Sequence, residues 1–522
     1  MPGKGLFMLG FSIPAPGLYK TARELRLDLS APSSSPQKTP RSPLLRMLRS
    51  GLAIACLVLL SGRARGGDVG DPIAVRGAAA ERTAVKPRNI ILMIGDGMGL
   101  AHISAARFHK GRLALEDMDH VGFSYTSSLE NFVTDSSASA TALASGYLIL
   151  NGWVSLHPDG SPTKTVLEYA EEKGMWTGLV VTCRVTHATP ACMIAHVKSR
   201  GEEQQIAEQI AAADVECILG GGWDMFLPTR TMKIDGGEWW GGEEDGEDGR
   251  GSGRGSGYGS DPTTAFAPGK GHTFLATGKD LLRRRTIPII EKQLVGADGK
   301  LYGSRKDKKN LIEGMEKRGY RFIRSASELM VASSGPPQKL LGLFNSGAMP
   351  KASEGRSPSL SAMSLAALKL LSQSPNGFFL MIEGSQIDWG GHANDFDYAV
   401  TEAADFDDTV GVVRRFLADA GIADETLIVV TADHETGGLT LNASSRSGGL
   451  EPKWTTGYHT GIPVPVFTAG PGSRGVAGIQ SHVNIGRYLI ESVVGQKIVF
   501  SYPRNDRSPA ASPGDARAVG KK

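Results

Sequence analysis

Acidic and histidine side chains follow several apolar segments of the sequence, in a combination typical of metal ligands. They are Asp96, Glu383, Asp388, His392, Asp433, His434 and His459. Three histidines with four carboxylates suit zinc together with a harder ion better than calcium alone. Two metals about 4 Å apart can clamp the attacking and leaving oxygens of a phosphoryl transfer. Taken singly, each motif is compatible with an ordinary turn, so the prediction depends on their coming together.

A serine at the start of a small-residue segment is the candidate nucleophile. Residues 136–144 can form a helix that Asp135 caps, which would place Ser136 at the helix N-terminus. Free amides and the helix dipole attract an anion there. A free serine is a poor nucleophile, but a metal can hold it as an alkoxide. The alternative, a small-residue helix packed closely on a sheet, explains the alanines but not the Asp-Ser start.

The elements that must position these side chains are continuous apolar strands. Five such runs occur, at Asn89–Gly95, Gly178–Thr182, Phe378–Ile382, Thr426–Thr431 and Val464–Phe467. Continuous apolarity indicates strands covered on both faces, as in parallel sheets, whose ligands bind beyond the carboxyl ends of the strands. Helix-like stretches lie between them, at Val166–Lys173, Glu202–Ala213, Ser361–Ser372 and Tyr398–Ala420. The pattern predicts an α/β fold, a three-layer α/β/α sandwich around a mostly parallel central sheet.

Composition limits the class of protein. The chain has 522 residues, 40% of them hydrophobic and 21% charged, which excludes a wholly disordered or fibrous chain. The formal net charge of +3 gives no reason to expect nucleic acid as a specific partner. Four cysteines cannot form a disulfide scaffold. We expect Cys183, Cys192 and Cys217 to be buried free thiols, although one pair could form a bridge.

The N-terminal region differs from the rest. Residues 1–66 carry ten Lys or Arg against two acids. Within them a basic flank, the ten-residue apolar run Gly51–Leu60 and small residues follow one another, as in a secretory signal peptide. Ten residues are too few to cross a bilayer, which needs about 20, so we expect no stable membrane span. A membrane anchor or a chance apolar run is the alternative.

These patterns divide the chain. We assign residues 1–46 to a non-native or disordered extension, 47–66 to the signal peptide, 67–87 to a flexible lead-in, 88–502 to the catalytic domain and 503–522 to a disordered tail. The chain is therefore expected to be exported to the periplasm or the extracellular space. Eleven of the 26 residues at 235–260 are Gly, beside clustered acids, which predicts a flexible surface insertion rather than a cation site.

The motifs, taken in order, resemble those of the alkaline phosphatase family. The matching stretches run from Gly95 to Gly99, from Asp135 to Thr141 and from Thr431 to Glu435. Several motifs in family order are far more specific than any one of them. The resemblance covers roughly residues 88–490 and implies the family's fold, two zinc ions, one magnesium ion and phosphomonoesterase activity.

The resemblance also implies a role for each site residue. Ser136 would be the nucleophile that becomes phosphoserine. The first zinc would be held by Asp388, His392 and His459, and the second by Asp96, Asp433 and His434. Magnesium would be held by Asp96, Thr189 and Glu383. Register with Thr189 places the family's phosphate-binding arginine at Arg200, whose guanidinium fits two phosphate oxygens.

Some positions depart from part of the family. His187 and Trp389 stand where some members carry Asp and Lys, and we expect both side chains near the magnesium ion and the substrate phosphate. His187 therefore leaves the third metal open, with a third zinc or cobalt as alternatives. The stretch between His434 and His459 is short beside members with an elaborated cap, and a homodimer is left open.

The prediction is a secreted alkaline phosphatase that hydrolyses small-molecule phosphate monoesters to an alcohol and inorganic phosphate through a phosphoserine. One alternative is a phosphodiesterase or sulfatase of the same fold. Arg200 argues against a diesterase, because a diester blocks an oxygen that the guanidinium would bind, and the Ser136 segment lacks the Pro and Arg of a sulfatase signature. The other alternative is a metal- or phosphate-binding protein without turnover.

Overall fold

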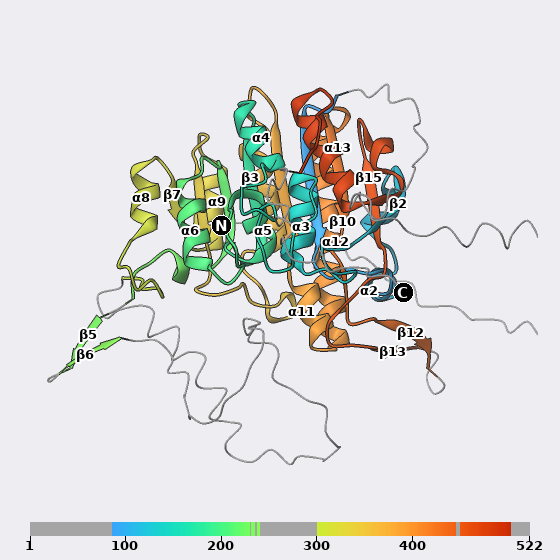
Figure 1. The fold of residues 1–522 in the computed structure, drawn as a ribbon, viewed down its shortest axis with the longest axis horizontal. Coiled ribbons are helices and arrows are strands. Elements are labelled where there is room, and N and C mark those ends of the chain that lie inside the picture. The colour runs from blue at the N-terminus through green and yellow to red at the C-terminus, as the bar shows by residue number, and fades with distance from the viewer. Residues whose placement is uncertain (1–85, 230, 235–236, 241–299, 445–448, 503–522) are drawn as a thin grey trace, which may run out of the picture. The chain divides into compact units, whose positions relative to one another are not determined.

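A ten-stranded sheet organises the part of the chain that this computed structural model describes, residues 86–229, 231–234, 237–240, 300–444 and 449–502 (Figure 1). The strand order is β16-β2-β15-β10-β1-β9-β3-β4-β8-β7. The strands, in chain order, are β1 (Asn89–Gly95), β2 (His120–Tyr125), β3 (Trp176–Arg184), β4 (Cys217–Gly221), β7 (Arg321–Ile323), β8 (Leu340–Leu343), β9 (Phe378–Gly384), β10 (Thr426–Thr431), β15 (Val464–Ala469) and β16 (Gly478–Ser481).

The strand directions confirm a mostly parallel sheet with one exception. The central strand β1 pairs in parallel with β9 and β10, and β3, β4, β8 and β7 continue in parallel on the β9 side. β15 runs antiparallel to both β10 and β2. The predicted run Val464–Phe467 lies in this antiparallel strand, so continuous apolarity there reflects burial and not strand direction. Its residues are apolar because the sheet is covered there, whichever way the strand runs.

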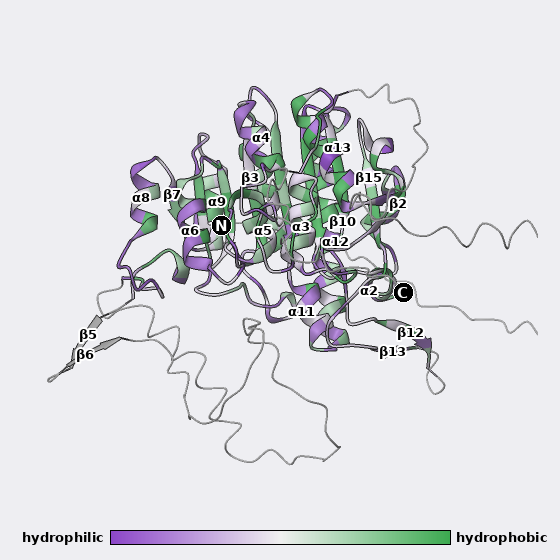
Figure 2. Ribbon diagram, viewed as in Figure 1, coloured by the Kyte–Doolittle hydropathy of each residue, from purple (hydrophilic) through white to green (hydrophobic). Residues whose placement is uncertain are grey.

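Helices cover both faces of the sheet. One face carries α3 (Ser136–Ser145), α4 (Val166–Glu172), α5 (Ala188–Ile194), α6 (Glu203–Ala212), α8 (Leu311–Lys317) and α13 (His482–Val494). The other carries α2 (Leu100–Lys110), α9 (Ala326–Ser333), α10 (Leu360–Leu371) and α12 (Phe396–Asp419). Alternate residues of β1 enter the two cores, with Ile90 and Leu92 on one side and Ile91 and Met93 on the other. Figure 2 shows largely hydrophobic strands between helices that carry both hydrophobic and hydrophilic residues.

Short elements lie beyond the carboxyl ends of the central strands. They are α11 (Gln386–His392), β11 (Glu435–Thr436) paired with β14 (His459–Thr460), and β12 (Thr440–Ala443) paired with β13 (Leu450–Lys453). In the described part of the chain, 3-10 turns lie at Ala114–Asp117, Trp223–Met225, Ala352–Glu354, Ala423–Glu425 and Ser473–Val476. β5 (Thr231–Ile234) pairs antiparallel with β6 (Gly237–Trp240), so the described part of the expected insertion at 235–260 is a paired strand.

The predicted helices, the cysteines and the terminal segments can each be compared with the structure. The four predicted helices are confirmed to within two residues at each end. Cys183, Cys192 and Cys217 are buried and free, as expected. Within the described ranges, no helix is both long enough and apolar enough to cross a membrane. The expected extension at 1–46, the signal peptide at 47–66, the tail at 503–522 and most of the lead-in and insertion lie outside the described residues.

Candidate active site

The carboxyl ends of three adjacent parallel strands supply three of the four acidic candidate ligands. Asp96 follows β1, Glu383 lies near the end of β9, and Asp433 follows β10. The turn after Asp96 needs a glycine, because Gly97 has a φ of +72° and a Cβ there would lie 2.7 Å from the Cα of Asp388. The close approach brings the segment that carries Asp388 against the end of β1.

Asp96, Asp433 and His434 form one compact set of ligand atoms, which we call the Asp96 group. Their ligand atoms lie within 4.8 Å of one another and all three residues are buried. His434 Nε2 is 3.2 Å from Asp433 Oδ2 and 3.6 Å from Asp96 Oδ1. These are the three residues that the family resemblance assigns together.

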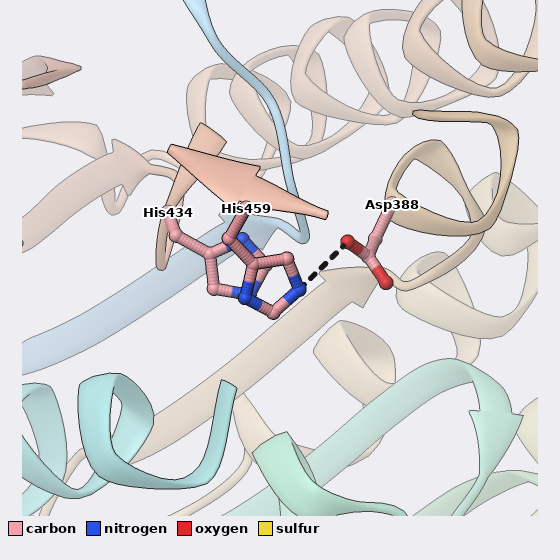
Figure 3. Close-up of side chains that lie close together, drawn as sticks. All are labelled: Asp388, His434 and His459. Carbon is pink, nitrogen blue, oxygen red and sulfur yellow. Dashed lines mark ion pairs between the residues drawn. The ribbon is translucent and has the colours of Figure 1, made fainter. Parts of the chain in front are cut away.

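Asp388, His392 and His459 form a second set, the Asp388 group. The i, i+4 spacing on α11 brings His392 Nε2 to 3.4 Å from Asp388 Oδ2. His459 Nε2 is 3.1 Å from His392 Nε2 and 3.6 Å from Asp388 Oδ1. The β11–β14 pairing sets Thr436 opposite His459 and so holds the His434 and His459 rings together. Asp388, His434 and His459 also offer ligand atoms within 4.8 Å of one another (Figure 3). Because His434 belongs to the Asp96 group as well, it is shared between the two sets of ligand atoms.

Backbone carbonyls orient two of the imidazole rings. His459 Nδ1 donates to the carbonyl oxygen of Thr134 at 2.8 Å, and His392 Nδ1 donates to that of Gly457 at 2.8 Å. Because Nδ1 carries the proton in both rings, Nε2 keeps its lone pair and faces the other ligands. A second hydrogen bond of this kind fixes ring orientation and raises ligand basicity.

The electrostatics of the site favour a bound cation. Burial raises the pKa of Asp96 well above its ordinary value, and the neighbouring Asp433 carboxylate raises it further. Burial likewise raises the pKa of Asp433 and of Glu383. Burial, followed by His459, lowers the pKa of His434 well below its ordinary value. A cation among these groups would favour ionised carboxylates and neutral imidazoles, which are the forms that bind metals.

Buried oxygen atoms without partners support the same reading. Both carboxylate oxygens of Asp96, Oε1 of Glu383 and Oδ2 of Asp433 have no hydrogen-bond partner within the described part of the chain. Buried polar atoms are normally paired, and an unpaired one requires an explanation such as an ion. Thr189, buried in the first turn of α5, lies close enough to Glu383 to offset part of the rise in its pKa. The donor set therefore fits metal ions.

Ser136 lies at the N-terminus of α3, beside the Asp96 group. Asp135 caps the helix by accepting a hydrogen bond from the Ala138 amide at 3.0 Å. Ser136 Oγ is 3.2 Å from His434 Nε2. The hydroxyl therefore points at the atom that would bind a metal, from a helix end that attracts anions.

Arg200 lies at the same helix end. Its guanidinium donates to Asp135 Oδ2 at 3.1 Å and faces His187 Nε2 at 3.3 Å. The same Asp135 oxygen accepts a hydrogen bond from the Gly152 amide at 3.0 Å. The Trp389 ring meets His187 edge-on at 6.0 Å between centroids. All of the candidate site residues thus lie at one end of the sheet, although neither His187 nor Trp389 has a ligand atom in the two groups.

Supporting residues escaped the sequence analysis. Buried His482, the first residue of α13, connects Ser124 Oγ at 2.5 Å with the Asp433 carbonyl oxygen at 3.0 Å. Thr436 Oγ1 donates to Asp388 and lies 3.2 Å from His434 Nδ1. Only the position of Thr436, two residues after a ligand, gave any signal. His482 has none, since its partners are 358 and 49 residues away.

A buried serine, an arginine and two metal-competent groups beyond the carboxyl ends of α/β strands form an arrangement typical of metal-dependent hydrolases of phosphate and related esters. The family model for alkaline phosphatase matches residues 87–254 and 278–453. The chain belongs to the alkaline phosphatase family.

Individual relatives agree with this assignment. Alkaline phosphatase 3 of Bacillus subtilis is 31% identical over 373 residues, which are 68% of this chain and 63% of that protein, so the chain spans less than two thirds of this relative. The structure of alkaline phosphatase from the Antarctic bacterium TAB5 is 29% identical, with a TM-score of 0.61, and covers 79% of this chain and 100% of that one. A His-to-Asp variant of the TAB5 enzyme, with Mg bound in its M3 site, has a TM-score of 0.59 and 29% identity over 80% of this chain and 100% of its own.

Proposed function

We propose that the chain is an alkaline phosphatase that hydrolyses phosphate monoesters through a phosphoserine at Ser136. One observation carries the proposal: the Ser136 hydroxyl, at the N-terminus of α3, lies between the metal-competent groups and an arginine fixed at the same helix end. A hydroxyl, the free amides of a helix N-terminus and a guanidinium near one helix end support a nucleophile and a phosphate-binding site there.

The residues of the chain divide the work between two displacements. Ser136 Oγ bonds to phosphorus, and the ester bond breaks to release the alcohol. Arg200 and the free amides of α3 bind the oxygens of the transferring phosphoryl group, where negative charge is spread in the transition state. Water then breaks the bond between Ser136 and phosphorus, which releases inorganic phosphate and restores the hydroxyl. Asp135 keeps Arg200 in register with Ser136 throughout, because it binds the guanidinium and caps the helix.

We assign two zinc ions to the Asp388 and Asp96 groups and magnesium to Asp96, Thr189 and Glu383. Imidazole with carboxylate suits zinc, and an all-oxygen set suits magnesium. When bound, such ions supply positive charge to the reacting oxygens and lower the pKa of bound water to about 7. The TAB5 variant with Mg in its M3 site supports a magnesium ion in this fold. His187 stands where some family members carry Asp, and its Nε2 faces Arg200. Metal analysis of the purified protein is therefore needed to identify the third ion.

Export is a separate part of the proposal. The basic and apolar pattern at 47–66 supports a signal peptide that is removed during export to the periplasm or the extracellular space. Expression of the full chain in a bacterial host, followed by fractionation and N-terminal sequencing, tests it. Recovery only in the cytosol with an uncut N-terminus would contradict export and leave the enzymatic proposal intact.

The enzymatic proposal is tested with three ester classes. Hydrolysis of a phosphate monoester, a diester and a sulfate ester is compared at pH 7 to 10, before chelation, after it, and after zinc and magnesium are restored. We expect a strong preference for the monoester that disappears with the metals and returns with them. Preference for the diester or the sulfate ester would contradict the role of Arg200.

Substitutions in α3 test the nucleophile. Ser136→Ala should retain zinc and lose most turnover, because no other group replaces the attacking oxygen. Ser145→Ala is the matched control, since Ser145 is also buried in α3 but donates only to the Thr141 carbonyl at 2.8 Å. Arg200→Ala should mainly weaken phosphate binding and leave a measurable rate. Equal activity of the Ser136 and Ser145 variants would refute the assignment.

A further inference from the structure

Three stacked aromatic rings connect the interior of the site with solvent. The His434 and His459 rings are stacked at 3.6 Å with an interplanar angle of 18°. The Tyr458 ring stacks on His459 at 4.4 Å with an angle of 10°. Both histidines are buried, whereas Tyr458 is 51% exposed. Tyr458 is therefore the outer end of a column that begins between the two ligand groups.

The backbone holds this tyrosine in place. The Tyr458 carbonyl accepts a hydrogen bond from the Gly437 amide at 2.9 Å, and its own amide donates to Thr456 Oγ1 at 3.0 Å. The next residue, His459, is fixed by its pairing with Thr436. A ring that is already ordered loses little conformational freedom when a ligand binds to it, so its contact area contributes to affinity more fully.

Two other large apolar side chains are exposed on segments that meet at His459. Phe132, 66% exposed, lies against Gly461, where a Cβ would be 2.3 Å from its ring. Ile462, 53% exposed, is the next residue along the chain. Phe132 also precedes by two residues Thr134, whose carbonyl orients His459. We call Tyr458, Phe132 and Ile462 the apolar rim.

The direction of displacement decides what the rim would contact. Attacking and leaving oxygens lie roughly in line on opposite sides of phosphorus. Ser136 lies against His434, which shares a set of ligand atoms with Asp96 and Asp433. An in-line attack from that side would direct the leaving oxygen toward the Asp388 group. Tyr458 stacks on His459 of that group, and its ring centroid is 6.0 Å from that of His392. The alcohol portion of a substrate therefore leaves toward the rim.

We propose that Tyr458, flanked by Phe132 and Ile462, is a binding site for the alcohol portion of the ester and selects phosphate monoesters of aromatic alcohols over those of small aliphatic ones. This inference rests on the proposed phosphomonoesterase activity. A flat exposed ring is suited to offset stacking on a second ring, whereas a short aliphatic chain gains little from it.

Benzyl phosphate and ethyl phosphate test the selectivity, because their alcohols are of similar acidity and differ mainly in the ring. Tyr458→Ala should lower kcat/KM for benzyl phosphate by about 5- to 10-fold, as expected for one lost aromatic contact. The value for ethyl phosphate should change by less than about twofold. Tyr458→Phe, which keeps the aromatic ring, should retain the wild-type preference for benzyl phosphate over ethyl phosphate. Phe108→Ala is the control, since Phe108 on α2 is 62% exposed and outside the rim.

Inhibitors that cannot be hydrolysed separate this inference from the function on which it rests. Benzylphosphonate should bind wild type more tightly than methylphosphonate, and Tyr458→Ala should abolish the difference. Unchanged selectivity in Tyr458→Ala would overturn the inference. A Tyr458→Ala protein that no longer forms a dimer but keeps its selectivity would also overturn it, because the apolar rim would then be a contact with a second copy of the chain. If wild type hydrolyses neither ester but shows Tyr458-dependent benzylphosphonate binding, the function fails and the binding site stands.

Discussion

The contact between α13 and α3 gives a quantitative prediction, because glycine allows two backbones to touch there. An ideal Cβ on Gly486 would lie 2.2 Å from the Ala142 carbonyl oxygen and 2.8 Å from that of Leu143. Ordinary contact begins near 3.4 Å, so Gly486→Ala must push the helices apart by about 1 Å. Overpacking of this kind costs about 1–3 kcal/mol, offset by up to about 1 kcal/mol from the better helix propensity of alanine.

We therefore expect Gly486→Ala to lower the free energy of unfolding by about 1–2 kcal/mol. Gly314→Ala is the matched control, because Gly314 lies in α8 with nothing within 4 Å of its ideal Cβ. That substitution should raise the free energy of unfolding by about 0.5–1 kcal/mol. Urea unfolding of the metal-loaded proteins, followed by tryptophan fluorescence and compared at equal m-values, measures both.

The same displacement should reach the nucleophile. Ser136 begins the helix that Gly486 contacts, and a misplacement of about 1 Å can cost on the order of 100-fold in rate. We expect kcat for a phosphate monoester to fall at least about tenfold in Gly486→Ala and to stay unchanged in Gly314→Ala. A Gly486→Ala protein as stable as wild type would refute the rigid contact. A destabilised but fully active one would show that α13 supports the fold without positioning Ser136.

Three further outcomes follow from the packing and charge of the chain. Burial raises the pKa of Glu171 to about 7, so its neutral form stabilises the fold below pH 4.5 and this contribution is lost as pH rises through 7. The free energy of unfolding of Glu171→Gln, measured in urea, should thus be about 1 kcal/mol higher than that of wild type at pH 8 and equal to it at pH 4. The same difference at both pH values would contradict the titration of Glu171. His482→Phe should weaken zinc affinity about 10- to 100-fold in competition with a chelator, because the Asp433 carbonyl loses its donor, and unchanged affinity would show that His482 does not position that ligand. Chelation should lower the free energy of unfolding, by about 4 kcal/mol for a metal present at 1,000 times its Kd, and so lower the unfolding temperature. An unchanged unfolding temperature after verified metal loss would show that metal binding is not coupled to folding.

The sequence predicted those features that depend on local pattern. The runs at β1, β3, β9 and β10 are apolar because both faces of the sheet are covered there. The residues of each strand are therefore enough to predict its burial. The cap on α3 is equally local, since Asp135 binds an amide three residues on. Neither property requires knowledge of distant residues.

The features that were missed depend on distant pairing or partial exposure. β2 has only two buried residues and carries His and Gly, so it lacks the apolar signal of a covered strand. The direction of β15 depends on the connection that precedes it and leaves no trace in its composition. The second role of Asp135, as a partner of Arg200, joins residues 65 positions apart. Such pairs can be recognised only when the fold has brought them together.

The two-residue β11–β14 ladder has a consequence for synthesis of the chain. It joins Thr436 to His459, and the ligands run from Asp96 to His459, so they enter the fold over most of its length. A ribosome adding about 5–20 residues per second needs on the order of 20–70 s to pass from the first ligand to the last. Until His459 emerges and pairs, the Asp388 group lacks one of its imidazoles. A nascent chain therefore carries its serine long before it carries a complete set of candidate metal ligands.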